Sequence, residues 1–210
     1  MNPSMKRCVI IGGAEIRNYE ALRQLLRPDD FAVYCDCGLN HRRGLGLEPG
    51  LIVGDFDSHE NPHLNVETII LPHEKDDTDT VYAVREAAQR GFDDFLLLGV
   101  VGGRLDHTLG NLAILLMLDS MGKHAVIADD YSEMEIISSG VGEIEDCYPY
   151  FSVLNISGQA EGVTITGARY NLTGAELSCE YPLGVSNEVL PGQTARVSVA
   201  KGRVLLIKDR

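Results

Sequence analysis

Two aspartates, Asp55 and Asp57, follow an apolar run in the segment Gly54-Asp55-Phe56-Asp57-Ser58. In extended backbone, alternate side chains point the same way, so both carboxylates can face one point while Phe56 turns away. Converging carboxylates repel each other unless a cation lies between them, and Mg²⁺ binds carboxylate oxygens together with substrate phosphates. The segment therefore predicts a magnesium site, although a solvated acidic turn with Ser58 as a helix cap also explains it.

A second acidic segment, Lys75-Asp76-Asp77-Thr78-Asp79, stands directly before a predicted helix. Acidic side chains near a helix N-terminus satisfy free amides and interact favourably with the helix dipole, which is a structural explanation for two of the aspartates. Three clustered negative charges still repel, and a cation shared with the first segment would remove that conflict. Lys75 has the charge to meet a phosphate, so we expect part of a metal and phosphate site here.

A glycine-rich turn joins a predicted strand to a predicted helix over residues 99–108, and it contains Arg104, Asp106 and His107. Glycines permit close backbone approach, and a helix N-terminus attracts anions. The Arg104 guanidinium can bind a phosphate through two parallel hydrogen bonds. The turn lacks the Gly-Lys-Ser/Thr ending of a P-loop, and ordinary helix capping remains an alternative for Asp106 and His107.

Three shorter motifs are weaker evidence for a binding site. Gly12-Gly13-Ala14 and Asp36-Cys37-Gly38 each follow a predicted strand, where a nucleotide can approach but where turn chemistry is an adequate explanation. Ser186-Asn187-Glu188, taken alone, has the composition of a surface turn.

Short apolar runs and helical patterns alternate in the first part of the chain, and together they must position these motifs. Strands are predicted over 8–11, 31–35, 51–53, 68–71, 95–98 and 125–128, and helices over 18–27, 78–90 and 106–121. Such alternation indicates a mainly parallel sheet covered by helices on both faces. In these sheets ligands bind beyond the carboxyl ends of the strands, and the polar motifs follow strand ends in that way.

The pattern changes after residue 130. Residues 131–150 are rich in Gly, Ser and acidic residues, and we expect a linker there. From residue 151 to 210 the apolar runs are short and separated by turn residues, with no long helical stripe. This is typical of an antiparallel sandwich. The sequence predicts an α/β domain over 1–130 and an all-β domain over 151–210.

Composition excludes several classes of protein. The net charge is −13 over 210 residues, which disfavours binding to nucleic acid phosphates or to an anionic membrane surface. No apolar run approaches the length of about 20 residues that a membrane span needs. The cysteine count is odd at 5, without zinc or redox spacing, which favours free thiols in a reducing cytoplasm.

In this order, Gly-Asp-Phe-Asp-Ser, Lys-Asp-Asp-Thr-Asp and Gly-Gly-Arg-Leu-Asp-His-Thr-Leu-Gly-Asn-Leu resemble the motifs of the thiamine pyrophosphokinases, also called thiamine diphosphokinases. The resemblance continues in the second half with Tyr170-Asn171-Leu172 and Val185-Ser186-Asn187-Glu188, so it spans nearly the whole chain. It implies a Rossmann-like α/β domain, a C-terminal β-sandwich and a homodimer with active sites at the subunit interface.

The resemblance also implies an activity: transfer of a pyrophosphoryl group from ATP to the hydroxyl of thiamine, giving thiamine diphosphate and AMP. Residue by residue, it implies Mg²⁺ ligands at Asp55, Asp57 and Asp79. Asp76, or less readily Asp79, would accept the hydroxyl proton, and Arg104 would bind phosphate at the reacting centre. The implied nucleotide-binding residues are Asp36, Gly38, Lys75, Thr78, Arg104, Asp106, His107 and Asn111, and the implied thiamine-binding residues are Ser186 and Asn187.

The sequence departs from the family pattern in ways that bear on thiamine rather than on phosphate chemistry. Asn171 stands where relatives often have Pro, Cys35 and Cys37 flank Asp36 in place of small residues, and the chain has no tryptophan to cover the thiamine ring. Two alternatives follow. One is a pyrophosphokinase for another alcohol, such as a hydroxymethylpterin. The other is a non-catalytic sensor that binds nucleotide or thiamine.

Overall fold

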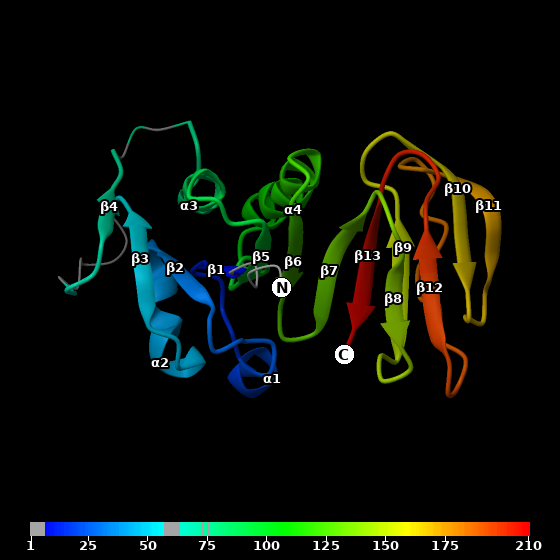
Figure 1. Ribbon diagram of the computed structural model, residues 1–210, viewed down its shortest axis with the longest axis horizontal. Coiled ribbons are helices and arrows are strands. Elements are labelled where there is room, and N and C mark those ends of the chain that lie inside the picture. Colours follow the sequence, from blue (N-terminus) through cyan, green and yellow to red (C-terminus); the bar gives the residue numbers. More distant parts are fainter. Residues whose placement is uncertain (1–6, 57–63, 73, 75) are drawn as a thin grey trace, which may run out of the picture. The chain divides into compact units, whose positions relative to one another are not determined.

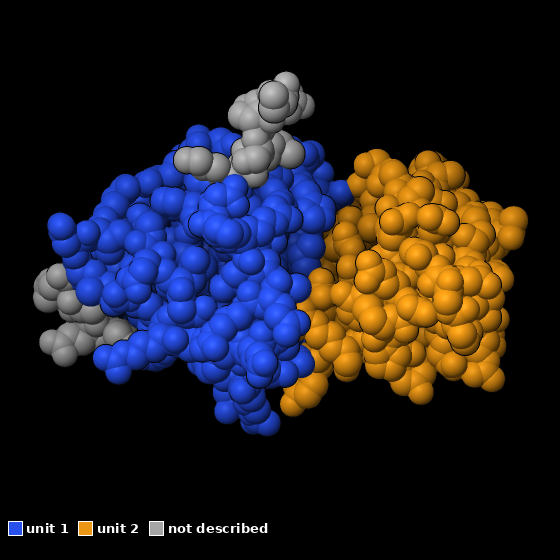
Figure 2. Space-filling view, turned by 60° about the horizontal axis from the view of Figure 1, so that its bottom comes forward, with its two compact units in different colours: residues 1–130 blue, residues 131–210 orange. Residues whose placement is uncertain are grey.

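The computed structural model describes residues 7–56, 64–72, 74 and 76–210, which form two compact units, 1–130 and 131–210 (Figure 2). The predicted site residues Asp57 and Lys75 lie outside the described part of the chain. Within that part, no helix has the length and apolar character needed to cross a membrane.

The first unit contains a parallel sheet, as the alternating pattern predicted. Its strands run in the order β4-β3-β2-β1-β5-β6 (Figure 1). Their bounds are β1 Arg7–Ile11, β2 Phe31–Cys35, β3 Pro49–Gly54, β4 Thr68–Ile70, β5 Asp94–Leu98 and β6 His124–Ala128. The strands in the middle of this order are almost wholly apolar and buried because helices cover both faces.

Helices lie on both sides of this sheet. They are α1 (Tyr19–Arg23), α2 (Arg42–Leu45), α3 (Asp79–Gln89) and α4 (Leu105–Ser120), with a 3-10 turn η1 over Asp36–His41. Leu22 of α1 and Leu45 of α2 pack in one core with Val9 and Ile11 of β1. The other pair, α3 and α4, contact each other and lie on the opposite side (Figure 1).

The first helix is shorter than the 18–27 expected: beyond Arg23 the Leu25 and Leu26 amides donate to the Leu22 and Arg23 carbonyls in tighter i→i+3 bonds, and side chains bind other backbone groups of the segment. The Arg7 guanidinium donates to the Leu25 carbonyl at 2.6 Å, and the Asp30 carboxylate accepts from the Arg27 amide at 2.7 Å. Those groups would otherwise continue the helix. A local periodicity cannot reveal competition from a residue on another strand.

The second unit is an antiparallel sandwich, and the linker expected over 131–150 is absent. Its seven strands are β7 Ser132–Ile137, β8 Gly142–Glu145, β9 Tyr150–Leu154, β10 Gln159–Thr166, β11 Leu172–Ser178, β12 Thr194–Ser198 and β13 Val204–Asp209. They pair as β7-β13-β9 and β11-β10-β12-β8. Ile137 and Ile144 of the supposed linker are buried in a core shared by both sheets, so apolar alternation outweighed the Gly and Ser content.

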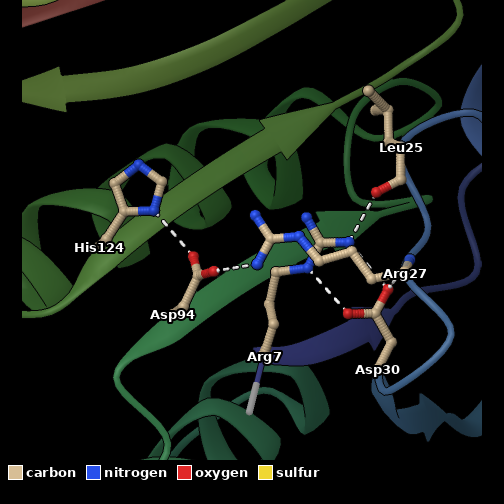
Figure 3. A network of polar contacts seen from close by, with 6 residues as sticks. All are labelled: Arg7, Leu25, Arg27, Asp30, Asp94 and His124. Carbon is tan, nitrogen blue, oxygen red and sulfur yellow. Dashed lines mark hydrogen bonds and ion pairs between the residues drawn. The ribbon is translucent and has the colours of Figure 1, made fainter. Parts of the chain in front are cut away.

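A buried ion pair anchors the amino edge of the parallel sheet (Figure 3). Both oxygens of Asp30 accept from the Arg7 guanidinium, at 2.9 and 2.8 Å, and the side chains are only 9% and 0% exposed. Beside them, the Asp94 carboxylate bonds both Arg27 and the ring of His124, each at 2.8 Å. These contacts link the segment before β2 to β1, β5 and β6.

We expect Asp30→Asn to lower the free energy of unfolding by roughly 3 kcal/mol, because it leaves the Arg7 charge buried without its counter-ion. Urea denaturation measures the change. The matched control is Asp77→Asn, which removes an ion pair with Arg85 whose side chains are 35% and 55% exposed. That variant is expected to lose less than about 1 kcal/mol. Equal losses in the two variants would contradict the anchoring role of Asp30.

Candidate functional site

Three carboxylates meet at the carboxyl edge of the parallel sheet. Asp36 follows β2, Asp55 follows β3, and Asp79 is the first residue of α3. One oxygen from each side chain lies within 4.8 Å of the other two. The parallel pairing of β2 with β3, in which Cys35 lies opposite Val53, brings the first two together.

The backbone at this edge is closely packed and locally strained. Asp36 has a φ of +39°, a left-handed conformation that Asp tolerates better than most residues. Gly54 lies against it, since a Cβ added at Gly54 would be only 3.2 Å from the Asp36 Cα. Gly38 is packed more tightly still, because a Cβ added there would overlap the Ile11 carbonyl oxygen. Close packing of η1 on β1 therefore explains why position 38 is a glycine, without the nucleotide contact that was expected there.

The donor set of the three-carboxylate cluster fits a hard cation. All three ligands are carboxylate oxygens, which Mg²⁺ prefers, and each residue is half-buried. The Asp36 Oδ1 atom is buried and accepts no hydrogen bond from the described residues. Such a group is costly to bury unless something positive reaches it. The electrostatics and the unsatisfied oxygen both indicate a cation site.

The neighbouring thiol does not take part in this cluster as a ligand. Cys35 is buried and its Sγ donates to the Asp79 carbonyl at 3.8 Å. Burial, and then the charge of Asp79, raise the pKa of Cys35 far above its usual range, so the thiol stays protonated. Cys35 therefore packs beneath the cluster.

The aspartates of the second motif have separate environments. Asp77 pairs with Arg85 at 2.6 Å, and Asp76 is exposed. The Thr78 hydroxyl caps α3 by accepting from the Val81 amide at 3.3 Å. Of this motif, only Asp79 enters the three-carboxylate cluster. Asp77 and Thr78 have structural roles at the start of α3, as an ion-pair partner and as the helix cap.

The glycine turn before α4 is held by two side chains of the helix it precedes. The Asn111 Nδ2 donates to the Val100 carbonyl at 2.8 Å, and the Thr108 hydroxyl accepts from the Gly102 amide at 3.1 Å. Asn111 is buried, so its amide shapes the turn. Gly99, Gly102 and Gly103 all have positive φ, which explains the three glycines.

Arg104 and Asp106 point into solvent and bond each other. The guanidinium meets the carboxylate at 2.6 and 3.2 Å, with the side chains 71% and 64% exposed. This contact lowers the pKa of Asp106 and raises that of Arg104. His107 beside them is also exposed. The Arg104 guanidinium is accessible to an anionic ligand that would compete with Asp106.

A buried histidine at the same edge was not singled out by sequence reasoning. His41, at the end of η1, has its Nε2 2.9 Å from the Ala14 carbonyl and its Nδ1 2.8 Å from the Tyr19 hydroxyl. With Nε2 protonated, the ring donates to the former and accepts from the latter. Burial lowers the pKa of His41. The sequence gives no signal for it, because His41 stands between Asn40 and Arg42, in a stretch that has the composition of a surface turn.

In the second unit, Asn187 holds a turn of the backbone. Its Oδ1 accepts from the amides of Tyr170 and Glu188, at 3.0 and 2.9 Å, and its Nδ2 donates to the Tyr170 carbonyl at 2.8 Å. At 3% exposure its amide has little surface for a ligand. Ser186 beside it is exposed and has a φ of +59°.

An open, mainly apolar cavity of about 240 Å³ adjoins this turn. It is lined by Ile165, Tyr170, Leu172, Leu183, Gly184, Val185 and Asn187. Two of these side chains, Tyr170 and Val185, are 60% and 55% exposed and are accessible to a ligand or partner.

Models of known protein families match both halves of the chain. The family model described as the catalytic domain of thiamin pyrophosphokinase matches residues 22–127, and the one described as its vitamin B1 binding domain matches residues 139–204. The chain belongs to the thiamin pyrophosphokinase family. The family resemblance and the fold class expected from the sequence are therefore confirmed.

Individual relatives cover most of the chain. The thiamine pyrophosphokinase of Bacillus subtilis is 28% identical over 172 residues, which are 78% of this chain and 80% of that protein. A crystal structure of the Bacillus subtilis thiamine pyrophosphokinase matches with a TM-score of 0.84 at 25% identity, covering 97% of this chain and 99% of that one. The structure from Geobacillus thermodenitrificans matches with a TM-score of 0.82 at 26% identity, covering 97% of each chain.

The low pKa of His41 predicts how stability responds to acid. The unfolded chain takes up a proton near the usual His pKa of about 6.5, which the folded state resists, so stability falls as the pH drops below that value. His41→Gln keeps one acceptor and one donor but does not titrate. Thermal unfolding between about pH 7 and 5 should show a smaller loss for this variant than for the wild-type protein. Parallel pH profiles would contradict the assignment.

Proposed function

We propose that this chain transfers the pyrophosphoryl group of ATP to the hydroxyl of thiamine, giving thiamine diphosphate and AMP. The observation that carries the proposal is the three-carboxylate cluster of Asp36, Asp55 and Asp79, located in a chain that matches both domains of the family. The match of residues 139–204 to the vitamin B1 binding model favours thiamine over a pterin alcohol.

The metal proposed for this cluster is Mg²⁺. Asp55 and Asp79 were expected as ligands from the sequence, and Asp57 belongs to the same expectation. The spacing of the carboxylate oxygens supports adding Asp36, which the sequence had assigned to the nucleotide. When bound, Mg²⁺ would offset the negative charge of the phosphates and orient their oxygens.

The phosphate and proton roles are assigned to neighbouring groups. We propose that the exposed Arg104 exchanges its contact with Asp106 for a phosphate oxygen. Asp76 is exposed and lies outside the three-carboxylate cluster, so its carboxylate is not among the proposed metal ligands, which supports it as the acceptor of the thiamine hydroxyl proton. The oxygen of that hydroxyl forms a bond to the β-phosphorus as the bond to AMP breaks. Lys75, Thr78, His107 and Asn111 remain proposed contributors to the nucleotide side.

Thiamine is proposed to bind the second unit at the cavity beside Ser186. The apolar lining from Tyr170, Leu183 and Val185 suits flat aromatic rings, and Tyr170 replaces the absent tryptophan in this role. Asn187 shapes the wall through its backbone contacts.

A homodimer is also proposed, because exposed apolar side chains gather near this cavity. Tyr170, Tyr181, Leu183 and Val185 are between 42% and 69% exposed, and a second copy of the chain would cover them. The five cysteines are free, which supports the cytoplasmic location inferred from composition.

Product analysis tests the function directly. Purified protein with ATP, Mg²⁺ and thiamine should release AMP and thiamine diphosphate in equal amounts, and EDTA should abolish both. ADP with thiamine monophosphate would contradict attack at the β-phosphorus. AMP release with a pterin alcohol only would contradict the substrate assignment, and nucleotide binding without turnover would favour a sensor.

Two asparagine variants test which aspartate in the motif over residues 75–79 is needed for catalysis. Asp79→Asn should lower kcat/KM at least about 100-fold and raise the Mg²⁺ concentration needed for turnover, because it removes one carboxylate ligand from the proposed metal site. The matched control Asp77→Asn breaks the ion pair with Arg85 and should retain activity. Normal turnover and unchanged Mg²⁺ demand in Asp79→Asn would contradict the metal assignment.

A further inference from the structure

The loop between β1 and α1, residues 12–18, connects the two parts of the proposed ATP site. The Ala14 amide donates to the Gly99 carbonyl at 2.8 Å, which joins the loop to the glycine turn before Arg104. The Ala14 carbonyl contacts His41 of η1 at 2.9 Å. Gly13 packs on Cys37, where a Cβ would lie 2.7 Å from the Cys37 Cβ. The loop therefore touches the turn that carries Asp36 and the turn that leads to Arg104.

The far end of this loop is held by Asp130, which follows β6 at the same edge of the sheet. Its Oδ2 accepts from the Arg17 amide and its Oδ1 accepts from the Asn18 amide, both at 2.9 Å. Hydrogen bonds from backbone amides to an ionised carboxylate are stronger than those between neutral groups. Asp130 also influences the residues around the loop, since burial and then its charge raise the pKa of Tyr19.

We propose that Asp130 is a positioning residue for MgATP. By binding the amides of Arg17 and Asn18, it fixes the loop over residues 12–18, and the loop keeps the Asp36 turn and the glycine turn at the spacing that the nucleotide requires. The proposal rests on the ATP-dependent function proposed above. Asp130 is given no direct contact with the substrate.

The bonds of Asp130 are separate from those that hold β6 in the sheet. β6 pairs with β5 along its whole length, from Asp94 opposite His124 to Leu98 opposite Ala128. The chain entering β6 is held by Lys123, which bonds Asp93 and the Phe92 carbonyl. Loss of the Asp130 carboxylate is therefore expected to loosen the loop while the sheet stays folded.

The test is Asp130→Asn in the full-length protein. The amide nitrogen of Asn cannot accept a hydrogen bond, so one of the two loop amides loses its partner. We expect faster hydrogen exchange in a peptide covering residues 12–18, and a Kd for MgATP that rises about tenfold, in line with loss of one charge-assisted hydrogen bond. KM for ATP should rise in parallel, with kcat within about twofold of the wild-type value.

The matched control is Asp29→Asn, which removes an exposed aspartate in the segment before β2. It should change neither the exchange of residues 12–18 nor the Kd. Unchanged exchange in Asp130→Asn, or faster exchange with wild-type Kd and KM, would overturn the proposal. A wild-type protein that binds MgATP without turning over thiamine would refute the proposed function alone, because the Kd comparison would still test Asp130.

Discussion

Mutual repulsion among Asp36, Asp55 and Asp79 is the constraint that the carboxyl edge of the sheet must overcome. Like charges at the separation of 4.8 Å or less found here repel by at least about 3.5 kcal/mol per pair at an effective dielectric constant of about 20. The start of α3 offsets part of this cost, because the helix dipole favours the charge of Asp79 at the first residue of that helix. Any cation bound there stabilises the folded state through the same charges.

The two edges of the parallel sheet differ in the kind of contact that holds them. At the amino edge, the buried pair of Arg7 and Asp30 ties the segments together with side chains. At the carboxyl edge, the Asn111 and Asp130 side chains bind the backbone of the turns, and in addition backbone packs directly on backbone: a Cβ at Gly12 would lie 2.6 Å from the Gly99 carbonyl oxygen. Close backbone packing leaves little freedom to the turns that carry Asp36 and Arg104, so their side chains can be held at a set spacing for a charged ligand.

The sequence predicted which segments form strands and helices, but not which of these segments lie side by side in the fold. Apolar runs followed by polar turns predicted the parallel sheet and placed Asp55 and Asp79 at its carboxyl edge, as the structure has them. The family resemblance assigned Asp36 to the nucleotide, and local pattern could not place it beside Asp55, because only the pairing of β2 with β3 brings the two together. For the same reason the bonds of Asp130 to a loop 112 and 113 residues away had no signal in the sequence. The expected linker failed because buried alternation decides strands more strongly than composition does.

We propose that Asp36, Asp55 and Asp79 together bind the metal that accompanies ATP. A crystal grown with Mn²⁺ and a non-hydrolysable ATP analogue tests it, because the anomalous signal of Mn²⁺ locates the ion independently of turnover. We expect a peak bonded to carboxylate oxygens of all three residues and to phosphate oxygens of the analogue. A peak that omits Asp36 or Asp79, or a nucleotide bound with its metal elsewhere on the chain, would contradict it.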